Sequence, residues 1–370
     1  MQDSTTKISP LLLDHIYTGD ALETLRTLPD GVVNCVVTSP PYYGLRDYGV
    51  AGQFGLEQST REYIGKLVDL FREIRRVLKV NGTAWVNLGD SYNNWGTDSL
   101  RRADSSGIGL TTEFAKEYSR KDKRPTDGLN RKSLMMIPAR VAIALQDDGW
   151  ILRSEIVWHK PNPMPESVTD RPTKAHEMIY LLSKSPRYFY DIDAVREPHA
   201  PSSLPRALRG VSEGNKWNNG APGSTAHSIS QPRPNTRKEH PEYSGSAGTG
   251  FKGHSGVYAE DGSLLINPAG RNSRTVWTIP TAAVKEAHFA TYPPELVRRC
   301  ILAGCPVDGV VLDPFMGSGT TALVARQLNR RYVGIELNPA YVEIAEKRLA
   351  MPFQTNMLYY TDDHEAVRND

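Results

Sequence analysis

Short apolar runs alternate along the chain with longer segments whose apolar residues recur every three or four positions. The short runs predict strands at residues 15–17, 32–37, 83–88, 151–158, 177–182, 310–312 and 332–335. The longer period predicts helices at residues 21–28, 60–79, 137–145, 293–302 and 321–328, and a last helix that Asn338 caps. We expect the pair Asn81-Gly82 to end the helix at 60–79. Strands that alternate with helices indicate an α/β fold with a mostly parallel sheet and helices on both faces.

Two polar segments interrupt this alternation. Residues 91–132 have no apolar period, and we interpret them either as a loop that faces a ligand or as solvated surface. Residues 196–274 are dominated by Gly, Pro, Ser and Asn, which is typical of a linker or, inside an α/β chain, of a functional insertion. We therefore divide the chain into two halves of one domain, an insertion and a loose tail. The two halves of the domain are residues 1–195 and 276–350, the insertion is residues 196–275, and the tail is residues 351–370.

Composition argues against several classes of protein. The net charge of the 370-residue chain is only +2, so any surface that binds nucleic acid must be local. The three cysteines form no CxxC pair and the histidines of the insertion lack ligand spacing, so we expect no metal site and no disulfide framework. The N-terminus is polar and no apolar run reaches about 18 residues. We therefore expect a cytoplasmic protein without a membrane partner.

The first candidate for chemistry is the sequence Thr38-Ser39-Pro40-Pro41-Tyr42-Tyr43, which follows the apolar run at 32–37. Each proline fixes φ at about −65° and lacks a donor, so the turn after this strand is stiff. The turn offers a hydroxyl, carbonyls without a ladder partner and an aromatic ring. These groups suit a planar molecule with an NH₂ group, whose hydrogens they accept and on whose face the ring stacks. An ordinary proline-rich turn is the alternative.

A second candidate follows the strand at 310–312 and reads Asp313-Pro314-Phe315-Met316-Gly317-Ser318-Gly319-Thr320-Thr321-Ala322. Its glycines permit a close approach of a ligand to the backbone, and the helix that follows points its N-terminus at that ligand. Glu336 ends the next strand, where a carboxylate is expected to bind ribose hydroxyls. The order of strand, glycine loop, helix, strand and acid predicts a cofactor that contains a nucleoside.

Two other nucleotide sites compete with this interpretation. The glycine loop also fits the dinucleotide fingerprint G-x-G-x-x-A, so NAD is an alternative. Asp313 counts against NAD, because an acid at the strand end repels a pyrophosphate but pairs with a cation such as an amino group. A P-loop is excluded, since no Gly-Lys-Ser/Thr follows.

The two motifs resemble those of the S-adenosylmethionine-dependent DNA amino-methyltransferases. Thr38-Ser39-Pro40-Pro41-Tyr42 is similar to their S/D/N-P-P-Y/F motif, and the sequence from Asp313 to Thr320 is similar to their cofactor motif. The catalytic motif comes first along the chain, which resembles the circularly permuted β group. The resemblance implies a mostly parallel, seven-stranded, doubly wound sheet with a terminal antiparallel hairpin, formed by the strands at 151–158 and 177–182. In this family the insertion, 196–275, is the target-recognition region.

The resemblance also implies a role for individual residues. Ser39 and the Pro40 carbonyl accept the hydrogens of the target amine, Pro41 completes the motif, and Tyr42 stacks on a base flipped out of the duplex. Glu336 binds the ribose, Asp20 lies near the adenine and Phe289 lines the cofactor pocket. The rest of the implied cofactor-binding set is Asp313, Phe315, Gly317, Ser318, Gly319, Thr320, Thr321 and Asn338. No metal is implied.

The resemblance implies double-stranded DNA as the partner and leaves the target base open. Ser before Pro-Pro is commoner in the enzymes that make N4-methylcytosine, so we expect cytosine, with N6 of adenine as the alternative. A cognate restriction endonuclease is a further expected partner. Basic residues around the insertion are candidates for DNA contacts: Arg206, Arg209, Arg233, Arg237, Lys238, Arg271 and Arg274.

Several interpretations remain open from the residues alone. A nicotinamide-dependent oxidoreductase and a non-catalytic DNA-binding protein are the competing classes of function. Asp90, after the strand at 83–88, either reaches the site or caps a turn. Trp158 lies either beside the flipped base or in the core.

Overall fold

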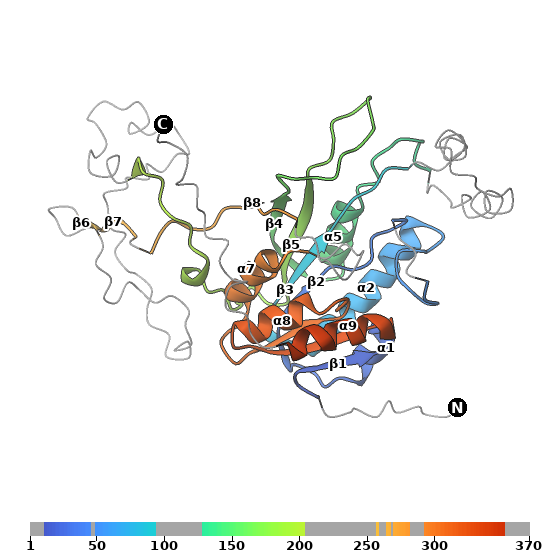
Figure 1. The fold of residues 1–370 in the computed structure, drawn as a ribbon, viewed down its shortest axis with the longest axis horizontal. Helices are drawn as coiled ribbons and strands as arrows, with labels where there is room; N and C mark the ends of the chain where they lie inside the picture. The colour runs from blue at the N-terminus through green and yellow to red at the C-terminus, as the bar shows by residue number, and fades with distance from the viewer. Residues whose placement is uncertain are drawn as a thin grey trace.

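The computed structural model describes residues 11–45, 49–93, 128–203, 257–258, 264–267, 269–281 and 292–351. Its centre is a sheet covered by helices (Figure 1). The sheet has eight strands in the order β1-β10-β9-β2-β3-β5-β4-β8. The strands are β1 (His15–Thr18), β2 (Val33–Thr38), β3 (Leu78–Leu88), β4 (Ile151–His159), β5 (His176–Ser183), β8 (Val276–Thr278), β9 (Val310–Asp313) and β10 (Arg331–Glu336). Every neighbouring pair is parallel except the two pairs that β5 makes. The predicted α/β class and the antiparallel hairpin of β4 and β5 are therefore confirmed, but the hairpin is not terminal, because β8 pairs with β4 beyond it.

The eighth strand, β8, is a difference from the expected seven. It has only three residues, with Trp277 buried between exposed neighbours, and so carries no readable period. Its place is set by pairing with β4 and by the Trp277 ring, which stacks on Trp85 at 6.2 Å between centroids. A tertiary contact, rather than a local pattern, creates this strand.

The start of β3 is a second difference. The helix predicted at 60–79 ends at Val77, and β3 begins at once with Leu78, so Asn81-Gly82 lies inside the strand instead of ending the helix. A side chain at Gly82 would place its Cβ 2.6 Å from Leu78 Cδ1 and 2.9 Å from the Asn34 carbonyl oxygen. The glycine is therefore needed for close packing against β2, and not as a helix stop.

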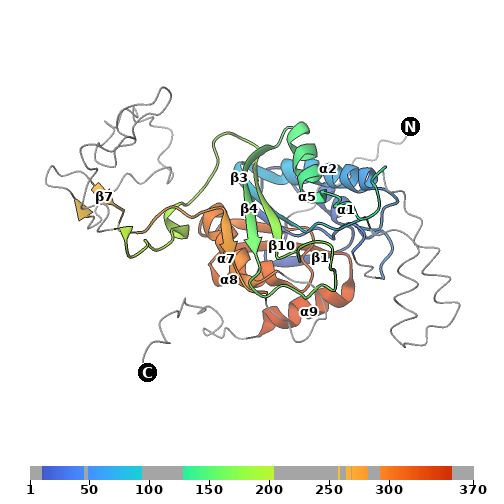
Figure 2. The same cartoon turned by 90° about the horizontal axis from the view of Figure 1, so that it is seen from above.

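Helices cover both faces of the sheet. One face packs against α1 (Ala21–Thr27), α2 (Thr60–Val77) and α5 (Ile137–Asp147), and the other against α7 (Pro294–Gly304), α8 (Thr320–Gln327) and α9 (Pro339–Ala350), as Figure 2 shows. Alternate residues of β2 serve the two cores: Val36 belongs to the first, and Cys35 and Val37 to the second. This alternation is the period of two that a strand requires.

The order of the strands reverses direction between β9 and β2. The chain passes from β2 through α2 to β3 on one side, and from β9 through α8 to β10 on the other. Both crossovers leave the same edge of the sheet, since the two strands are parallel. In open α/β sheets, ligands bind outside the carboxyl ends of the strands at such a switch point.

The predicted insertion is described only at its ends and at one small hairpin. β6 (Val257–Tyr258) and β7 (Leu264–Ile266) pair antiparallel, apart from the main sheet. A short 3₁₀ helix, η1 (Asp193–Val195), precedes the insertion, and the isolated bridge between Glu197 and Arg271 joins its two ends. The predicted tail lies almost entirely outside the described residues.

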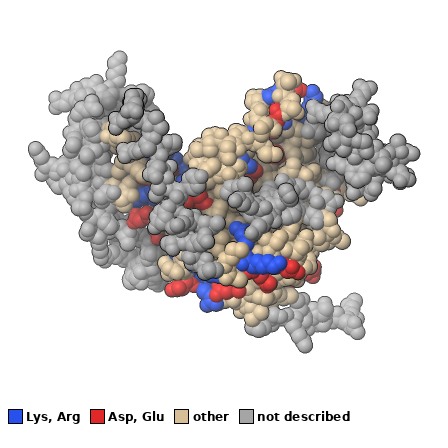
Figure 3. Space-filling model, in the orientation of Figure 1, with Lys and Arg blue, Asp and Glu red and all other residues tan. Residues whose placement is uncertain are grey.

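The described surface and helices agree with the composition. On the face seen in Figure 3, Lys and Arg of the described residues are intermixed with Asp and Glu, as expected for a net charge of +2. Among the described helices, none combines the length and the apolarity that crossing a membrane requires.

We predict that Phe71→Ala lowers the free energy of unfolding by about 3–5 kcal/mol, because the ring is fully buried and packs edge-on against Trp150. Urea denaturation followed by circular dichroism measures the change. Ile143→Ala on α5 is the control, since this side chain is 57% exposed and its loss should change the unfolding free energy by no more than about 0.5 kcal/mol. Similar losses in the two variants would contradict this assignment of the core.

Candidate active site

The two sequence motifs meet at the switch point between β2 and β9. Thr38 ends β2 and Asp313 ends β9, and the Thr38 hydroxyl donates a hydrogen bond to Asp313 Oδ1 at 2.8 Å although 275 residues separate them. Ser39 follows the first strand directly, and the glycine loop follows the second. The parallel pairing of the strands therefore brings both motifs to one edge of the sheet.

Asp313 is the centre of a buried hydrogen-bond cluster. Its Oδ1 also accepts from the backbone N–H of Phe315 at 3.0 Å, and its Oδ2 accepts from the hydroxyls of Tyr292 and Thr321, each at 2.7 Å. The residue is completely buried. Burial raises the pKa of Asp313, whereas these hydroxyl and amide donors act to lower it. The carboxylate lies beneath the glycine loop and fixes it, so it does not stand in the wall of the pocket above.

A pocket opens above this cluster. Residues of both motifs line it, together with residues after β1, after β10 and in the loop before α2. They are Gly19, Asp20, Ala21, Ser39, Pro41, Val50, Gly52, Gln53, Phe54, Pro314, Phe315, Gly317, Ser318, Glu336, Leu337, Asn338 and Tyr341.

Eight of the predicted residues therefore share one pocket: Ser39, Pro41, Asp20, Phe315, Gly317, Ser318, Glu336 and Asn338. Six others lie around it without lining it: Pro40, Tyr42, Asp313, Gly319, Thr320 and Thr321. Phe289 lies outside the described residues, as do Arg206, Arg209, Arg233, Arg237 and Lys238.

The glycine loop has the backbone that its sequence predicts. Gly317 and Gly319 have φ values of 53° and 84°, in the left-handed region that other residues rarely adopt. A side chain at Gly319 would also place its Cβ 2.8 Å from that of Ala345, so this glycine lets α8 begin against α9. Thr320 and Thr321 are buried in the first turn of α8, where the Thr321 hydroxyl donates to Asp313.

Glu336 closes the pocket at the end of β10. Its carboxylate accepts the backbone N–H groups of Gly317 at 2.7 Å and Asn338 at 2.9 Å. Burial raises the pKa of Glu336, while these backbone donors oppose the rise. A carboxylate offers about four lone-pair sites, so acceptor capacity remains for hydroxyl groups of a ligand.

These residues fit a cofactor that contains a nucleoside. The pocket combines the acceptor carboxylate of Glu336 with apolar walls from Phe315, Phe54 and Tyr341, and the rings of Phe54 and Phe315 meet edge-on at 5.3 Å between centroids. Asp20 also lines the pocket, just after Gly19, whose N–H donates to the Glu336 carbonyl at 2.9 Å, and it caps α1 by accepting the N–H of Glu23 at 2.9 Å. The carboxylates can accept hydrogen bonds from the ribose hydroxyls of a nucleoside, and the aromatic rings can pack against its flat base, as nucleoside binding requires.

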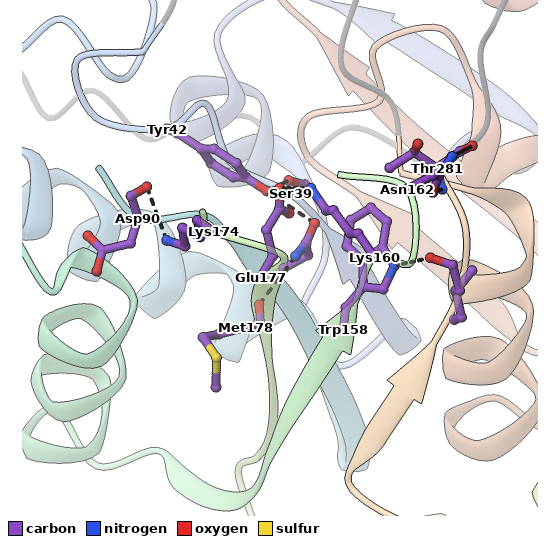
Figure 4. Close-up of polar contacts among 12 residues, drawn as sticks. Ser39, Tyr42, Asp90, Trp158, Lys160, Asn162, Lys174, Glu177, Met178 and Thr281 are labelled. Atoms are coloured by element: carbon purple, nitrogen blue, oxygen red, sulfur yellow. Dashed lines mark hydrogen bonds and ion pairs between the residues drawn. The ribbon is translucent and has the colours of Figure 1, made fainter. Parts of the chain in front are cut away.

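The turn Ser39-Pro40-Pro41-Tyr42, called the proline corner below, extends from this pocket into a polar network, which Figure 4 shows. The Ser39 hydroxyl donates to the Tyr42 oxygen at 3.3 Å, and the Tyr42 hydroxyl lies 2.6 Å from Glu177 Oε2 and 3.1 Å from Asn87 Oδ1. Glu177 forms an ion pair with Lys160. The site thus holds an acid that no motif indicated.

The Tyr42 side chain has a close neighbour in the chain after β3. A Cβ on Gly89 would lie 2.4 Å from Tyr42 Cε2, so only glycine lets the ring lie there. Burial and the neighbouring Glu177 hold the pKa of Tyr42 well above its ordinary value, and the phenol keeps its proton.

The sequence missed Glu177, Asn87 and the pocket residues between Val50 and Phe54. Glu177 is a single acid at the start of an apolar strand, and such an acid signals a buried partner when the strand reads as core. The glycines of the loop at 44–56 were the available signal for the second group, since they permit close packing against a ligand.

The smaller alternatives are decided by the contacts. Asp90 Oδ1 accepts the backbone N–H groups of Ser91 at 2.9 Å and Ile137 at 3.0 Å, so it caps a turn and the start of α5. Trp158 is buried and donates to the Ile279 carbonyl at 2.8 Å, as a core residue does. Among the described residues, no group of three or more His, Cys, Asp and Glu is placed to hold a metal ion.

Arg271 and Arg274, expected to contact DNA, hold the two ends of the insertion together. Both guanidinium groups donate to Glu197 Oε2, at 3.1 and 3.2 Å. The Arg274 side chain is still 67% exposed, whereas that of Arg271 is 36% exposed. Arg271 in particular has a structural partner that the sequence could not show.

Comparison with known proteins agrees with this geometry. A family model described as DNA methylase (N6_N4_Mtase) matches residues 33–347. The chain is 42% identical over 334 residues to the type II methyltransferase M.Cfr9I of Citrobacter freundii, covering 90% of this chain and 87% of that protein. It is 38% identical over 335 residues to the type II methyltransferase M.SmaI of Serratia marcescens, covering 90% of each.

The fold is similar to that of a solved structure, the PvuII DNA methyltransferase (cytosine-N4-specific). The TM-score is 0.54 with 18% sequence identity, and the match covers 92% of this chain and 86% of the other. At this identity the similarity shows the shared fold.

We predict that Asp313→Asn lowers the free energy of unfolding by about 2–3 kcal/mol, because the new NH₂ group faces a donor in the buried cluster and leaves it unpaired. Urea denaturation measures the change. Asp308→Asn is the matched control, since Asp308 is exposed with φ 59°, a conformation that Asn tolerates. Equal stability of the two variants would show that the Asp313 cluster does not fasten the two strands.

Proposed function

This chain belongs to the N6/N4 family of DNA methylases, and we propose that it is a site-specific enzyme that methylates N4 of cytosine in duplex DNA. The methyl donor of this family is S-adenosylmethionine. The observation that carries the proposal is that one pocket is lined both by Ser39 and Pro41 of the proline corner and by Phe315, Gly317 and Glu336 of the cofactor half. A target amine and a nucleoside cofactor placed by these two sets of residues are neighbours.

The cofactor half supplies binding and orientation. In this proposal Glu336 accepts hydrogen bonds from the ribose hydroxyls, Asp20 lies near the adenine, and the backbone of the glycine loop approaches the methionine part. Asp313 and Thr321 act through the loop that Asp313 holds, and not by contact, whereas Thr320 keeps its expected place beside the methionine part. Phe289 keeps its expected role as a pocket residue. When bound, the cofactor supplies an electrophilic methyl group on a sulfonium.

The proline corner prepares the nucleophile. An exocyclic amine is a poor nucleophile because its lone pair is delocalised into the ring. Ser39 Oγ and the Pro40 carbonyl accept its two hydrogens in a fixed geometry, which favours a pyramidal nitrogen with its lone pair directed at the methyl group. Tyr42 stacks on the flipped base. The corner then accelerates the in-line displacement mainly by positioning.

The choice of cytosine is supported by Ser39. In the family that the motif resembles, Ser in this position is commoner among enzymes that form N4-methylcytosine, and Asp or Asn among those that form N6-methyladenine. The runner-up is therefore methylation of adenine N6 by the same corner. The oxidoreductase alternative has no support from the family match, and the intact corner argues against a protein that only binds DNA.

The insertion at 196–275 is proposed to read the recognition sequence. The described ends of this insertion are joined by the contacts of Glu197 with Arg271 and Arg274. The relatives carry the name of type II methyltransferases. We therefore propose that a restriction endonuclease of the same specificity accompanies this enzyme.

Incubation of the purified protein with labelled S-adenosylmethionine and duplex DNA of mixed sequence should yield N4-methylcytosine after digestion to nucleosides. Chromatography of the nucleosides measures the product, and DNA that is already methylated by the enzyme is the control. N6-methyladenine would move the proposal to the alternative base. The absence of both products with a broad pool of sites would refute a DNA amino-methyltransferase.

Ser39→Ala should lower the turnover number about 10²-fold, because one of the two acceptors that orient the amine is lost. Cofactor affinity, measured by calorimetry, should change little, since Ser39 is not among the residues assigned to the nucleoside. Ser185→Ala is the matched control, because Ser185 follows β5 at the opposite edge of the sheet. Equal losses of turnover and cofactor affinity in Ser39→Ala would contradict the assigned role.

A further inference from the structure

Glu177 is a partly buried acid beside the proline corner, where burial of its charge is unfavourable. It is the second residue of β5, its side chain is 15% exposed, and the strand residues that follow run into the core. Removing a carboxylate from water is unfavourable unless the charge is paired. Lys160, the residue directly after β4 and 19% exposed, pairs with Oε1, so Oε2 remains directed at Tyr42 (Figure 4).

A chain of hydroxyl groups joins this acid to the pocket. Ser39, which lines the pocket, donates to the Tyr42 oxygen at 3.3 Å. The Tyr42 hydroxyl has one proton and two acceptors in reach, and Glu177 at 2.6 Å is nearer than Asn87 at 3.1 Å. Each donor in the chain therefore points away from the pocket and toward the carboxylate. The lone pairs of Ser39 Oγ are left to accept from an amine.

We propose that Glu177 is the acceptor of the proton that the target amine must lose, and that the hydroxyls of Ser39 and Tyr42 carry it there. This inference rests on the proposed function. As the amine nitrogen bonds to the methyl carbon, the bond from that carbon to sulfur breaks and the nitrogen becomes positively charged. One N–H proton passes to Ser39 Oγ, the Ser39 proton to Tyr42 Oη, and the Tyr42 proton to Glu177 Oε2. Both hydroxyls end as they began.

The surroundings of the chain suit this transfer. Tyr42 keeps its proton at rest, because burial and Glu177 raise the pKa of its phenol, and it therefore relays a proton without storing charge. Asn87 is fixed by its own hydrogen bond to the Met178 carbonyl at 3.2 Å. Lys160 pairs with Oε1 of the carboxylate and leaves Oε2 to face the Tyr42 hydroxyl. The other charged groups nearby are Lys174, which donates to the Asp90 carbonyl at 3.1 Å, and Asp90 itself.

The alternative role for Glu177 is purely geometric, since a buried acceptor also holds the Tyr42 ring in place. Glu177→Gln separates the two roles only in part. The amide still accepts from Tyr42, but it leaves Lys160 without its ion-pair partner. The double variant Lys160→Met/Glu177→Gln removes that cation, keeps an acceptor for Tyr42 and still lacks a carboxylate. It is therefore the deciding variant.

The test is single-turnover methyl transfer to DNA, with cofactor and DNA affinities measured separately. Glu177→Gln should slow transfer about 10²–10⁴-fold, the range of one lost acid–base group, with affinities within about 2-fold of the wild type. The double variant should remain as slow. Tyr42→Phe should also be slow, and adding Glu177→Gln to it should cost little more. Glu155→Gln, an exposed acid on the adjacent strand, is the matched control and should be unaffected.

A second readout does not depend on activity. The near-ultraviolet absorbance of phenolate, taken as the difference between proteins with and without the Tyr42→Phe substitution, follows the ionisation of Tyr42 alone. Because the Glu177 charge helps to raise the pKa of Tyr42, Glu177→Gln should let Tyr42 ionise at a lower pH. Unchanged ionisation would show that the two groups do not interact in solution and would overturn the proposal.

The outcomes distinguish this proposal from the proposed function. If Glu177→Gln transfers methyl groups at the wild-type rate, the relay alone is overturned. The same holds if the double variant recovers the full rate. No transfer by the wild type to any DNA overturns both. If Glu177→Gln fails to fold, as loss of cofactor binding would reveal, Tyr42→Phe removes only a hydroxyl and tests the relay by itself. A wild-type rate in that variant overturns the relay.

Discussion

The buried carboxylate of Asp313 is the contact on which the site depends. Two loops leave the sheet at the ends of β2 and β9, and neither loop alone forms a pocket. Asp313 joins them, since it accepts from Thr38 on one strand, from Phe315 in the glycine loop, and from Tyr292 and Thr321 on the elements around it. Burial of an acid is unfavourable. Its donors compensate that cost, and the result is a rigid joint between the two halves.

The rest of the site follows from this joint and from the topology. The strand order reverses at β9 and β2, so helices on the two sides leave a crevice at their carboxyl ends. On the side of the glycine loop, the backbone turns at Gly317 and Gly319, and Glu336 accepts a hydrogen bond from Gly317. A network of side chains occupies the other side, where Ser39, Tyr42 and Glu177 form a chain of hydrogen bonds. In the proposals above, the first side holds the cofactor and the second accepts hydrogens of the target amine.

The parts that were predictable share a physical reason, which is that they are local. The prolines after Ser39 stiffen a turn whatever surrounds it, and the glycines at 317 and 319 mark backbone that only glycine adopts readily. Glu336 was predictable from its spacing after the glycine loop. The roles of Asp90 and Trp158 were not, because each depends on which backbone group lies opposite, and the fold supplied a helix start for the first and a distant carbonyl for the second.

The order of elements, the α/β class and the two motifs were determined by the sequence alone, because apolar period and turn chemistry act over a few residues. Only the tertiary structure decided that Asp313 fixes the loop from below, that β8 adds a strand to the sheet, and that Arg271 binds Glu197. It also decided that Glu177 faces Tyr42, which is 135 residues earlier in the chain. The reason is that a hydrogen bond or an ion pair requires two particular atoms to lie close together. For residues far apart in the chain, strand pairing across the sheet determines which atoms do so.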